Sequence, residues 1–232
     1  MQDNHSLCEL ARLARDCYDG GVGLRDFEFF EGELDVQVFA RASGETLIVV
    51  FRGTDSIQDW MSDLQIRQIP LPFAASSKIR VHYGFYRCYK VARPFLMRKI
   101  EDCVPKQVVI VGHSLGGGMA TIFAYELGVK FPNLIVQNTT FGSPRVGNRA
   151  FAKHYDSLPI YTHRFVDPED VIPTVPYVNY RHIGGRCECS AEGWRRTVGR
   201  RRSCFSVCCV CSRSEHSMEN YCTSLDAQNK RE

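Results

Sequence analysis

The chain has 232 residues, of which 44% are hydrophobic and 11% aromatic, and its formal net charge at pH 7 is +3. This length and composition are typical of one globular domain, residues 1–232, large enough to bury a core of its own. No apolar run approaches the ~20 residues that a membrane-spanning helix needs, which excludes an integral membrane protein of that kind.

The first 21 residues are polar and helix-like, without a basic segment followed by an apolar one. No signal peptide is visible, so we expect a cytoplasmic protein or one peripheral to membranes, unless the chain begins after processing. Eleven cysteines are present, six of them within residues 186–213. Without a signal peptide, reduced thiols or a metal site are favoured over a disulfide framework.

Hydrophobic periodicity predicts alternating strands and helices along the chain. In chain order we expect an amphipathic helix over 7–18, strands over 34–40 and 46–51, an apolar helical stripe over 57–64, a loop over 69–73, a short strand over 79–85, a helix over 87–102, a strand over 108–111, a helix over 119–127, a strand over 134–141, a helix from 148 and a strand over 160–166. This alternation predicts an α/β fold with a mostly parallel central sheet and right-handed crossovers. In such sheets the reacting groups gather beyond the carboxyl ends of the strands.

The sequence VVIVGHSLGGG, from Val108 to Gly118, predicts a nucleophile elbow. A buried strand, the motif Gly-x-Ser-x-Gly and a helix follow one another, and this context separates the motif from an ordinary glycine-rich turn. Ser114 must adopt a strained backbone angle on so sharp a turn, and Gly112 and Gly116 allow the strand and helix to approach closely. The turn also puts the serine Oγ at the positive end of a helix, where an oxyanion is stabilised.

A second candidate oxyanion donor follows the strand over 46–51. Gly53 and Thr54 lie at the end of that strand, where an acyl-transfer enzyme keeps such a donor. A simple helix cap is the alternative role for Thr54. The stripe over 57–64 is either core packing or a mobile amphipathic lid beside an active site.

Enzymes with this elbow carry the catalytic acid and then the histidine downstream of the serine. Asp167, Glu169 and Asp170 follow the strand over 160–166, and each is a candidate acid. Of the two later histidines, His182 lies in a segment that we expect to be a strand, and we interpret it as structural. His216 lies in a loop before the last helix and can fold back to the serine, so it is the candidate general base.

Seven motifs, in order and spread over roughly residues 10 to 225, resemble those of the fungal-type class 3 lipase family. They are FRGTDSIQDWMSDL, VHYGFYRCY, VGHSLGGGMA, TFGSPRVGN, FVDPEDVIPTVP, YRHIGG and EHSMENY. The resemblance implies an α/β-hydrolase fold, with helices on both faces of the sheet. It also implies a triacylglycerol lipase-like carboxylic ester hydrolase that acts in lipid degradation.

Carried over by position, the resemblance makes Ser114 the nucleophile, His216 the base and Asp170 the acid. Thr54 and the Leu115 N–H group would form the oxyanion hole. His216 would take the serine proton as Oγ attacks the ester carbonyl, and water would later release the fatty acid from the acyl-enzyme. This chemistry needs no metal or organic cofactor.

The resemblance also places the family's lid at residues 56–63. The lid residues that it assigns are Ser56, Ile57, Trp60 and Met61, with the tryptophan as the aromatic anchor.

Residues 186–213 depart from the family pattern. This insertion has seven arginines against Glu188 and Glu192, a local balance of +5. A solvated loop, cross-linked or not, is one interpretation, and an anionic-surface contact through the arginines and Trp194 is another. A zinc knuckle is the third, although the spacing of the cysteines matches known fingers poorly. Its ligands would come from Cys187, Cys189, Cys204, Cys208, Cys209 and Cys211.

Two functions of different classes follow from the sequence. The first is an active serine esterase or lipase, and the second is a catalytically silent hydrolase-fold module whose basic insertion binds a partner or metal. The presence of all three triad positions favours the first. We expect a monomer whose partner is a lipid ester substrate at a membrane or lipid-droplet surface, and no nucleic acid, because the arginine run lacks interleaved aromatic residues.

Overall fold

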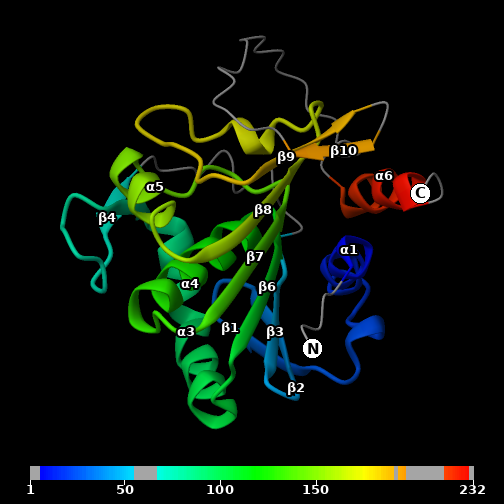
Figure 1. The fold of residues 1–232 in the computed structure, drawn as a ribbon, viewed down its shortest axis with the longest axis horizontal. Helices are drawn as coiled ribbons and strands as arrows, with labels where there is room; N and C mark the ends of the chain where they lie inside the picture. The colour runs from blue at the N-terminus through cyan, green and yellow to red at the C-terminus, as the bar shows by residue number, and fades with distance from the viewer. Residues whose placement is uncertain (1–5, 55–66, 191–192, 197–216, 230–232) are drawn as a thin grey trace.

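The computed structural model describes residues 6–54, 67–190, 193–196 and 217–229 (Figure 1). The helices and strands are α1 (Leu7–Asp16), β1 (Glu28–Gly32), β2 (Val36–Ser43), β3 (Thr46–Phe51), β4 (Gln68–Pro70), β5 (Arg80–His82), α3 (Tyr83–Cys103), β6 (Gln107–His113), α4 (Leu115–Lys130), β7 (Ile135–Phe141), α5 (Arg149–Tyr155), β8 (Ile160–Val166), β9 (Arg186–Ser190), β10 (Gly193–Arg196) and α6 (Met218–Asn229). Short 3-10 turns lie at Val22–Leu24 and Ile172–Thr174.

A mixed sheet of eight strands, in the order β1-β2-β3-β6-β7-β8-β9-β10, forms the centre of the molecule. Strands β3, β6, β7, β8 and β9 run parallel, and antiparallel pairs at the two ends add β2, β1 and β10. The predicted α/β fold with a mostly parallel central sheet is confirmed. Parallel strands need crossover connections, which α3, α4 and α5 supply.

Helices cover both faces of this sheet, as predicted (Figure 1). Along β6, Val108 and Ile110 pack into a core with α3 and α4, whereas Val109 and Val111 pack on the opposite face with residues of α1 and α6. Because successive side chains of a strand point to opposite faces, a strand with two covered faces must be apolar throughout. This is why the runs at 46–51 and 108–111 are continuous rather than alternating.

Two strands lie where the sequence predicted none. β4 occupies part of the predicted loop over 69–73 and pairs with β5 in a separate two-stranded sheet. β1 pairs with β2 at the edge of the main sheet, where its side chains are exposed or half-buried, so its hydrophobic signal is weak. The helix expected over 87–102 begins earlier, at Tyr83, where the His82 side chain accepts a hydrogen bond from the Gly84 N–H.

The segments around residue 186 also differ from expectation. The expected strand over 180–184 is absent, and Arg181 forms only an isolated bridge with Gly147. The start of the insertion is not a loop, because β9 pairs with β8 and turns back as β10 to extend the sheet. Parallel pairing with β8 gives this polar sequence a strand position that its own pattern does not indicate. Residues 197–213 lie outside the described residues.

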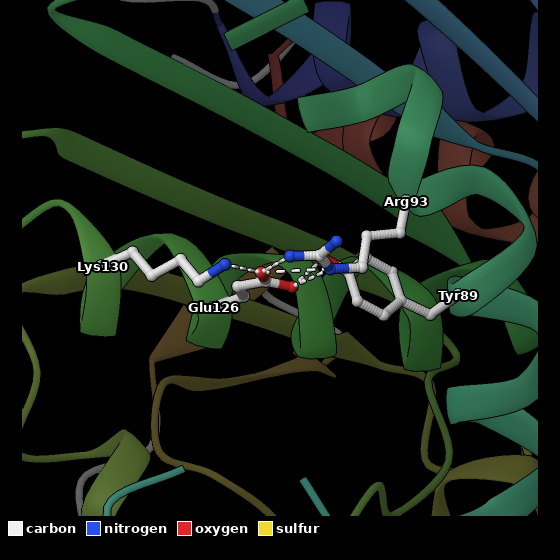
Figure 2. A network of polar contacts seen from close by, with 4 residues as sticks. All are labelled: Tyr89, Arg93, Glu126 and Lys130. Atoms are coloured by element: carbon white, nitrogen blue, oxygen red, sulfur yellow. Dashed lines mark hydrogen bonds and ion pairs between the residues drawn. The ribbon is translucent and has the colours of Figure 1, made fainter. Parts of the chain in front are cut away.

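A buried charge cluster fixes α4 to α3 (Figure 2). The Glu126 side chain is fully buried and accepts hydrogen bonds from the Tyr89 hydroxyl at 2.6 Å and the Arg93 Nη2 at 2.5 Å, while the Lys130 Nζ lies 2.6 Å away. Burial alone would raise the pKa of Glu126. The hydrogen bonds from Arg93, Lys130 and Tyr89 outweigh burial and lower the pKa below its usual value, so the carboxylate stays ionised.

Replacing Glu126 by glutamine should destabilise the fold by about 2–3 kcal/mol at neutral pH. A fully buried pair typically costs ~3–5 kcal/mol to break, and Arg93 and Lys130, at 33% and 36% exposed, regain some water. The depressed pKa stabilises the folded state above the ordinary glutamate pKa of ~4.3. The difference between the two proteins in urea unfolding should therefore shrink as the pH falls below that value.

Glu45→Gln is the matched control for this experiment, because Glu45 pairs with Lys106 on the surface, where both side chains are more than half exposed. Its loss should cost less than about 1 kcal/mol. Equal destabilisation by the two substitutions would contradict the importance of the buried cluster.

Candidate active site

Ser114 occupies a strained junction between β6 and α4. Its backbone angles are φ 55° and ψ −125°, in the positive-φ region that residues with side chains rarely adopt. The Ser114 N–H donates to the Phe141 carbonyl at 3.0 Å, and the Ser114 carbonyl accepts from the Gly117 N–H at 3.0 Å. The side chain is buried, and within the described part of the chain its Oγ has no hydrogen-bond partner. A hydroxyl held in this way is available to a base and a substrate.

The glycines of the elbow are required by close backbone approach, as the sequence predicted. A Cβ atom at Gly112 would lie 2.5 Å from the Gly116 carbonyl oxygen, and one at Gly116 would collide with the Phe51 carbonyl oxygen. A Cβ at Gly118 would meet the ring of Phe85 on α3 at 2.9 Å. Side chains at these positions would push α4 away from β6, β3 or α3.

The two predicted oxyanion donors come from different elements next to the elbow. Leu115 is the first residue of α4, and the N–H groups of a first helical turn have no partner within the helix. Thr54 is half-buried and follows β3, whose Phe51 pairs with Gly112 of β6. The adjacent Gly53 packs closely on Ser114, since a Cβ built on it would lie 3.1 Å from the serine Cβ.

Asp170 differs from the other two candidate acids in burial. Its side chain is 3% exposed, and its two carboxylate oxygens accept hydrogen bonds from the Ile172 N–H at 2.9 Å and the Tyr221 hydroxyl at 2.7 Å. Asp167 is half-buried and accepts a hydrogen bond from the Glu169 N–H, and Glu169 is exposed. Among these three, only the carboxylate of Asp170 is described as accepting a hydrogen bond from a side chain of α6.

Tyr221 is a site residue that the sequence analysis did not assign. It lies on α6 and is buried, and its hydroxyl oxygen also accepts the Asp167 N–H at 3.2 Å. Its ring packs 6.2 Å from the ring of His113 and 5.9 Å from that of Phe141, the two residues that flank Ser114 in space. Burial, together with the charge of Asp170, raises the Tyr221 pKa well above its usual value, so the hydroxyl remains a donor.

Tyr18 makes a second polar link that the sequence did not reveal. Predicted as one of the apolar contacts of the first helix, it accepts the Gly53 N–H at 3.0 Å, and its hydroxyl lies 2.8 Å from the His113 Nδ1. Residues 95 apart in sequence are thereby joined beside the elbow. The EHSMENY motif contains Tyr221, but nothing in the local pattern around Tyr18 indicates this contact.

The remaining site predictions fall partly outside the described residues. His216 and the lid residues Ser56, Ile57, Trp60 and Met61 lie there, so their roles stay predictions. His182 makes a structural contact, with its Nε2 2.6 Å from the Pro173 carbonyl. Within the described residues no cluster of histidine, cysteine, aspartate or glutamate could hold a metal, and four of the six insertion cysteines are not among them.

The chain is similar to proteins of known sequence and structure. The chain is 34% identical over 143 residues to a lipase of Rhizomucor miehei and 29% identical over 163 residues to the chloroplastic phospholipase A(1) DAD1 of Arabidopsis thaliana. These alignments cover 58% and 62% of the chain but only 38% and 36% of the relatives. The chain therefore spans well under half the length of the curated relatives that it matches.

The fold matches lipase II from Rhizopus niveus with a TM-score of 0.73 at 24% identity, over 89% of this chain and 90% of that one. The family model for lipase (class 3) matches residues 48–180, which is more than half of the chain. This segment runs from β3 through the elbow to the loop after Asp170, so the match includes Thr54, Ser114 and Asp170, whereas Tyr18 and Tyr221 lie outside it. The chain belongs to the class 3 lipase family.

Proposed function

We propose that this protein hydrolyses carboxylic ester bonds of lipids through an acyl-enzyme formed on Ser114. The observation that carries the proposal is the strained, buried serine between the N-terminus of α4 and the backbone of Gly53. Relatives that are called lipase and phospholipase A(1) support a lipid ester as the substrate class.

In the proposed mechanism His216 is the general base and Asp170 orients it. His216 lies two residues before Met218, which is buried in the same core as Phe141 and Tyr221. His216 itself lies outside the described residues, so its role as the base rests on the family resemblance and on its place in the sequence just before α6. The hydrogen bond between Tyr221 and Asp170 brings the acid to the same helix. This arrangement supports Asp170, rather than Asp167 or Glu169, as the acid.

Thr54 and Leu115 are the proposed oxyanion donors. As Oγ attacks, negative charge develops on the carbonyl oxygen, and N–H groups fixed before the reaction stabilise it without reorganising. The protonated histidine then gives its proton to the leaving alcohol, and water regenerates the serine. Residues 56–63, shortly after Thr54, are the proposed lid, and a monomer acting at a membrane or lipid surface remains our expectation.

Hydrolysis of a p-nitrophenyl ester chain-length series by the native chain and by Ser114→Ala tests the proposal. Removal of the nucleophile should lower kcat by a factor of about 10⁴ or more. Ser143→Ala is the matched control, because this neighbouring buried serine bonds only its own loop, at the Pro144 carbonyl. If the folded native chain and Ser114→Ala were equally active or equally inactive, the silent binding module would be favoured.

Replacing Thr54 by valine removes the side-chain hydroxyl and keeps the backbone N–H. If the hydroxyl stabilises the oxyanion, kcat should fall about 10²–10³-fold while KM changes little. Thr46→Val, at the far end of β3, removes a buried hydroxyl from the same strand and should leave kcat unchanged. A normal kcat in Thr54→Val would leave only the backbone donor in the proposal.

Tyr221→Phe keeps the ring contacts with His113 and Phe141 and deletes the hydrogen bond to Asp170. Because a buried carboxylate loses one of its two described donors, kcat should fall about 10-fold at constant KM. Tyr155→Phe is the control, since its equally buried hydroxyl bonds Asn138 and Thr162 away from the elbow. This control should lower the melting temperature without lowering kcat, whereas a loss of stability alone in Tyr221→Phe would make that residue structural only.

A further inference from the structure

Three segments of the chain carry positive charge without any negative charge. Residues 67–82, 142–155 and 171–185 contain no aspartate or glutamate. Their basic residues are Arg67, Lys78, Arg80, Arg145, Arg149, Lys153 and Arg181. These are seven of the 29 lysines and arginines, so the rest of the chain has 22 basic against 26 acidic residues and is net negative.

The three segments meet in space and form one surface, which we call the basic face. The Arg181 N–H donates to the Gly147 carbonyl at 2.8 Å, and the Asn148 N–H donates to the Arg80 carbonyl at 3.0 Å. The Gln68 side-chain amide donates to the Asn179 carbonyl at 2.9 Å. In Figure 1 these elements, β4 and α5 among them, lie at the side of the molecule away from α1 and α6.

Most charges of the basic face are open to solvent, and one exposed acid, Asp156, lies at its margin, where it accepts the Gly184 N–H at 2.7 Å. Arg67, Arg149 and Arg181 are exposed, as are both lysines, whereas Arg80 and Arg145 are half-buried. Within the described part of the chain, no ion pair involves any of the seven. Burial lowers the pKa of Arg145, and repulsion from the nearby Arg181 adds to this effect. A bound anion would relieve this repulsion.

Two exposed side chains with apolar surface lie within the basic face. Tyr177 is 53% exposed and Val178 is 55% exposed, and both lie on the loop between Asp170 and Arg181. The Arg145 guanidinium stacks over the Tyr177 ring, 5.4 Å from its centroid. A tyrosine and an aliphatic residue on a surface that also carries arginines match the layered chemistry of a bilayer interface, where phosphates lie above the acyl chains.

We propose that the basic face docks on a bilayer containing anionic phospholipids, with the arginines and lysines against the headgroup phosphates and Tyr177 and Val178 at the acyl boundary. The docked bilayer supplies the lipid for the proposed ester hydrolysis. The docking proposal rests on the proposed function only in taking this lipid as the substrate. The segments 142–155 and 171–185 follow β7 and β8, whose carboxyl ends lie at the same edge of the sheet as Ser114. The bound bilayer therefore lies beside the elbow. A nucleic acid is the alternative polyanionic partner, but the exposed aliphatic side chain of Val178 provides no favourable contact for it.

Co-sedimentation with vesicles tests the proposal. The full chain is incubated with vesicles of phosphatidylcholine alone or mixed with phosphatidylserine, at low and high salt, in the Ser114→Ala background so that no lipid is consumed. Binding should require phosphatidylserine and weaken with salt. The triple variant Arg149→Gln, Lys153→Gln and Arg181→Gln should lower the partition coefficient on the order of 100-fold, as expected for three interfacial charges.

A matched variant controls for net charge. Arg25, Lys90 and Arg98 are exposed and lie outside the basic face, and their replacement by glutamine removes the same charge. This control should bind almost as the parent does, and circular dichroism should show both triple variants folded. Equal loss in the two triple variants, or no binding to anionic vesicles, would overturn the proposal. Tight binding of single-stranded RNA in place of vesicles, or competition by inorganic phosphate alone, would also overturn it.

The two proposals fail separately. Hydrolysis of a water-soluble p-nitrophenyl ester does not need docking, so the triple basic-face variant with Ser114 intact should retain it. A chain that hydrolyses the ester but does not bind vesicles would contradict the docking proposal and leave the esterase proposal intact. A chain that binds vesicles but hydrolyses no ester would contradict the esterase proposal and leave the docking proposal intact.

Discussion

The backbone of Ser114 is the constraint on which the candidate site depends. A positive φ at a residue with a side chain costs about 1–3 kcal/mol and persists only where the surroundings leave no alternative. Here the Ser114 N–H is bonded to β7, and β6 and the first turns of α4 are buried between two cores. Gly112 has no room for a Cβ, so the turn cannot relax toward an ordinary helix start. The central sheet and α4 therefore fix Ser114, the proposed nucleophile, and the other groups of the proposed mechanism must be brought to it.

Contacts on one face of the sheet hold α4 and the turn in place, and contacts on the other face bring further polar groups to the turn. On one face the buried Glu126 joins α4 to α3, and a helix held in this way cannot slide along β6 and release the turn. On the other face α1 and α6, which come from opposite ends of the chain, pack together and contribute Tyr18 and Tyr221. One tyrosine bonds the backbone beside Thr54, and the other bonds Asp170. The polar side of the site is thus built by the helices farthest apart in sequence.

Local sequence patterns predicted the elements that are buried on both faces. They missed the segments that become strands only by pairing with a neighbouring strand. The strand over 46–51 and the elbow at Ser114 were predicted because burial and tight turns leave strong signals in a few adjacent residues. Strands β1, β9 and β10 were missed, because edge strands with polar or half-exposed side chains become strands through their neighbours. Tyr18 and Tyr221 act through contacts with residues 95 and 51 positions away, which no periodicity encodes. His216 and the lid residues rest on the family resemblance alone.

The sheet topology that brings the residues of the candidate site together also brings together the positive charges of the basic face. Loops that leave the carboxyl ends of parallel strands end at one edge of the sheet, and here the loops after β7 and β8 carry Arg145 and Arg181 while the turn after β6 carries Ser114. Because these loops are hydrogen-bonded to one another, the basic face and the elbow are rigidly related. The seven basic residues of this face favour an approach direction that turns it toward an anionic surface. That direction turns the edge carrying Ser114 toward the lipid, and a buried nucleophile needs this orientation because it can react only with an ester delivered to its own side of the sheet.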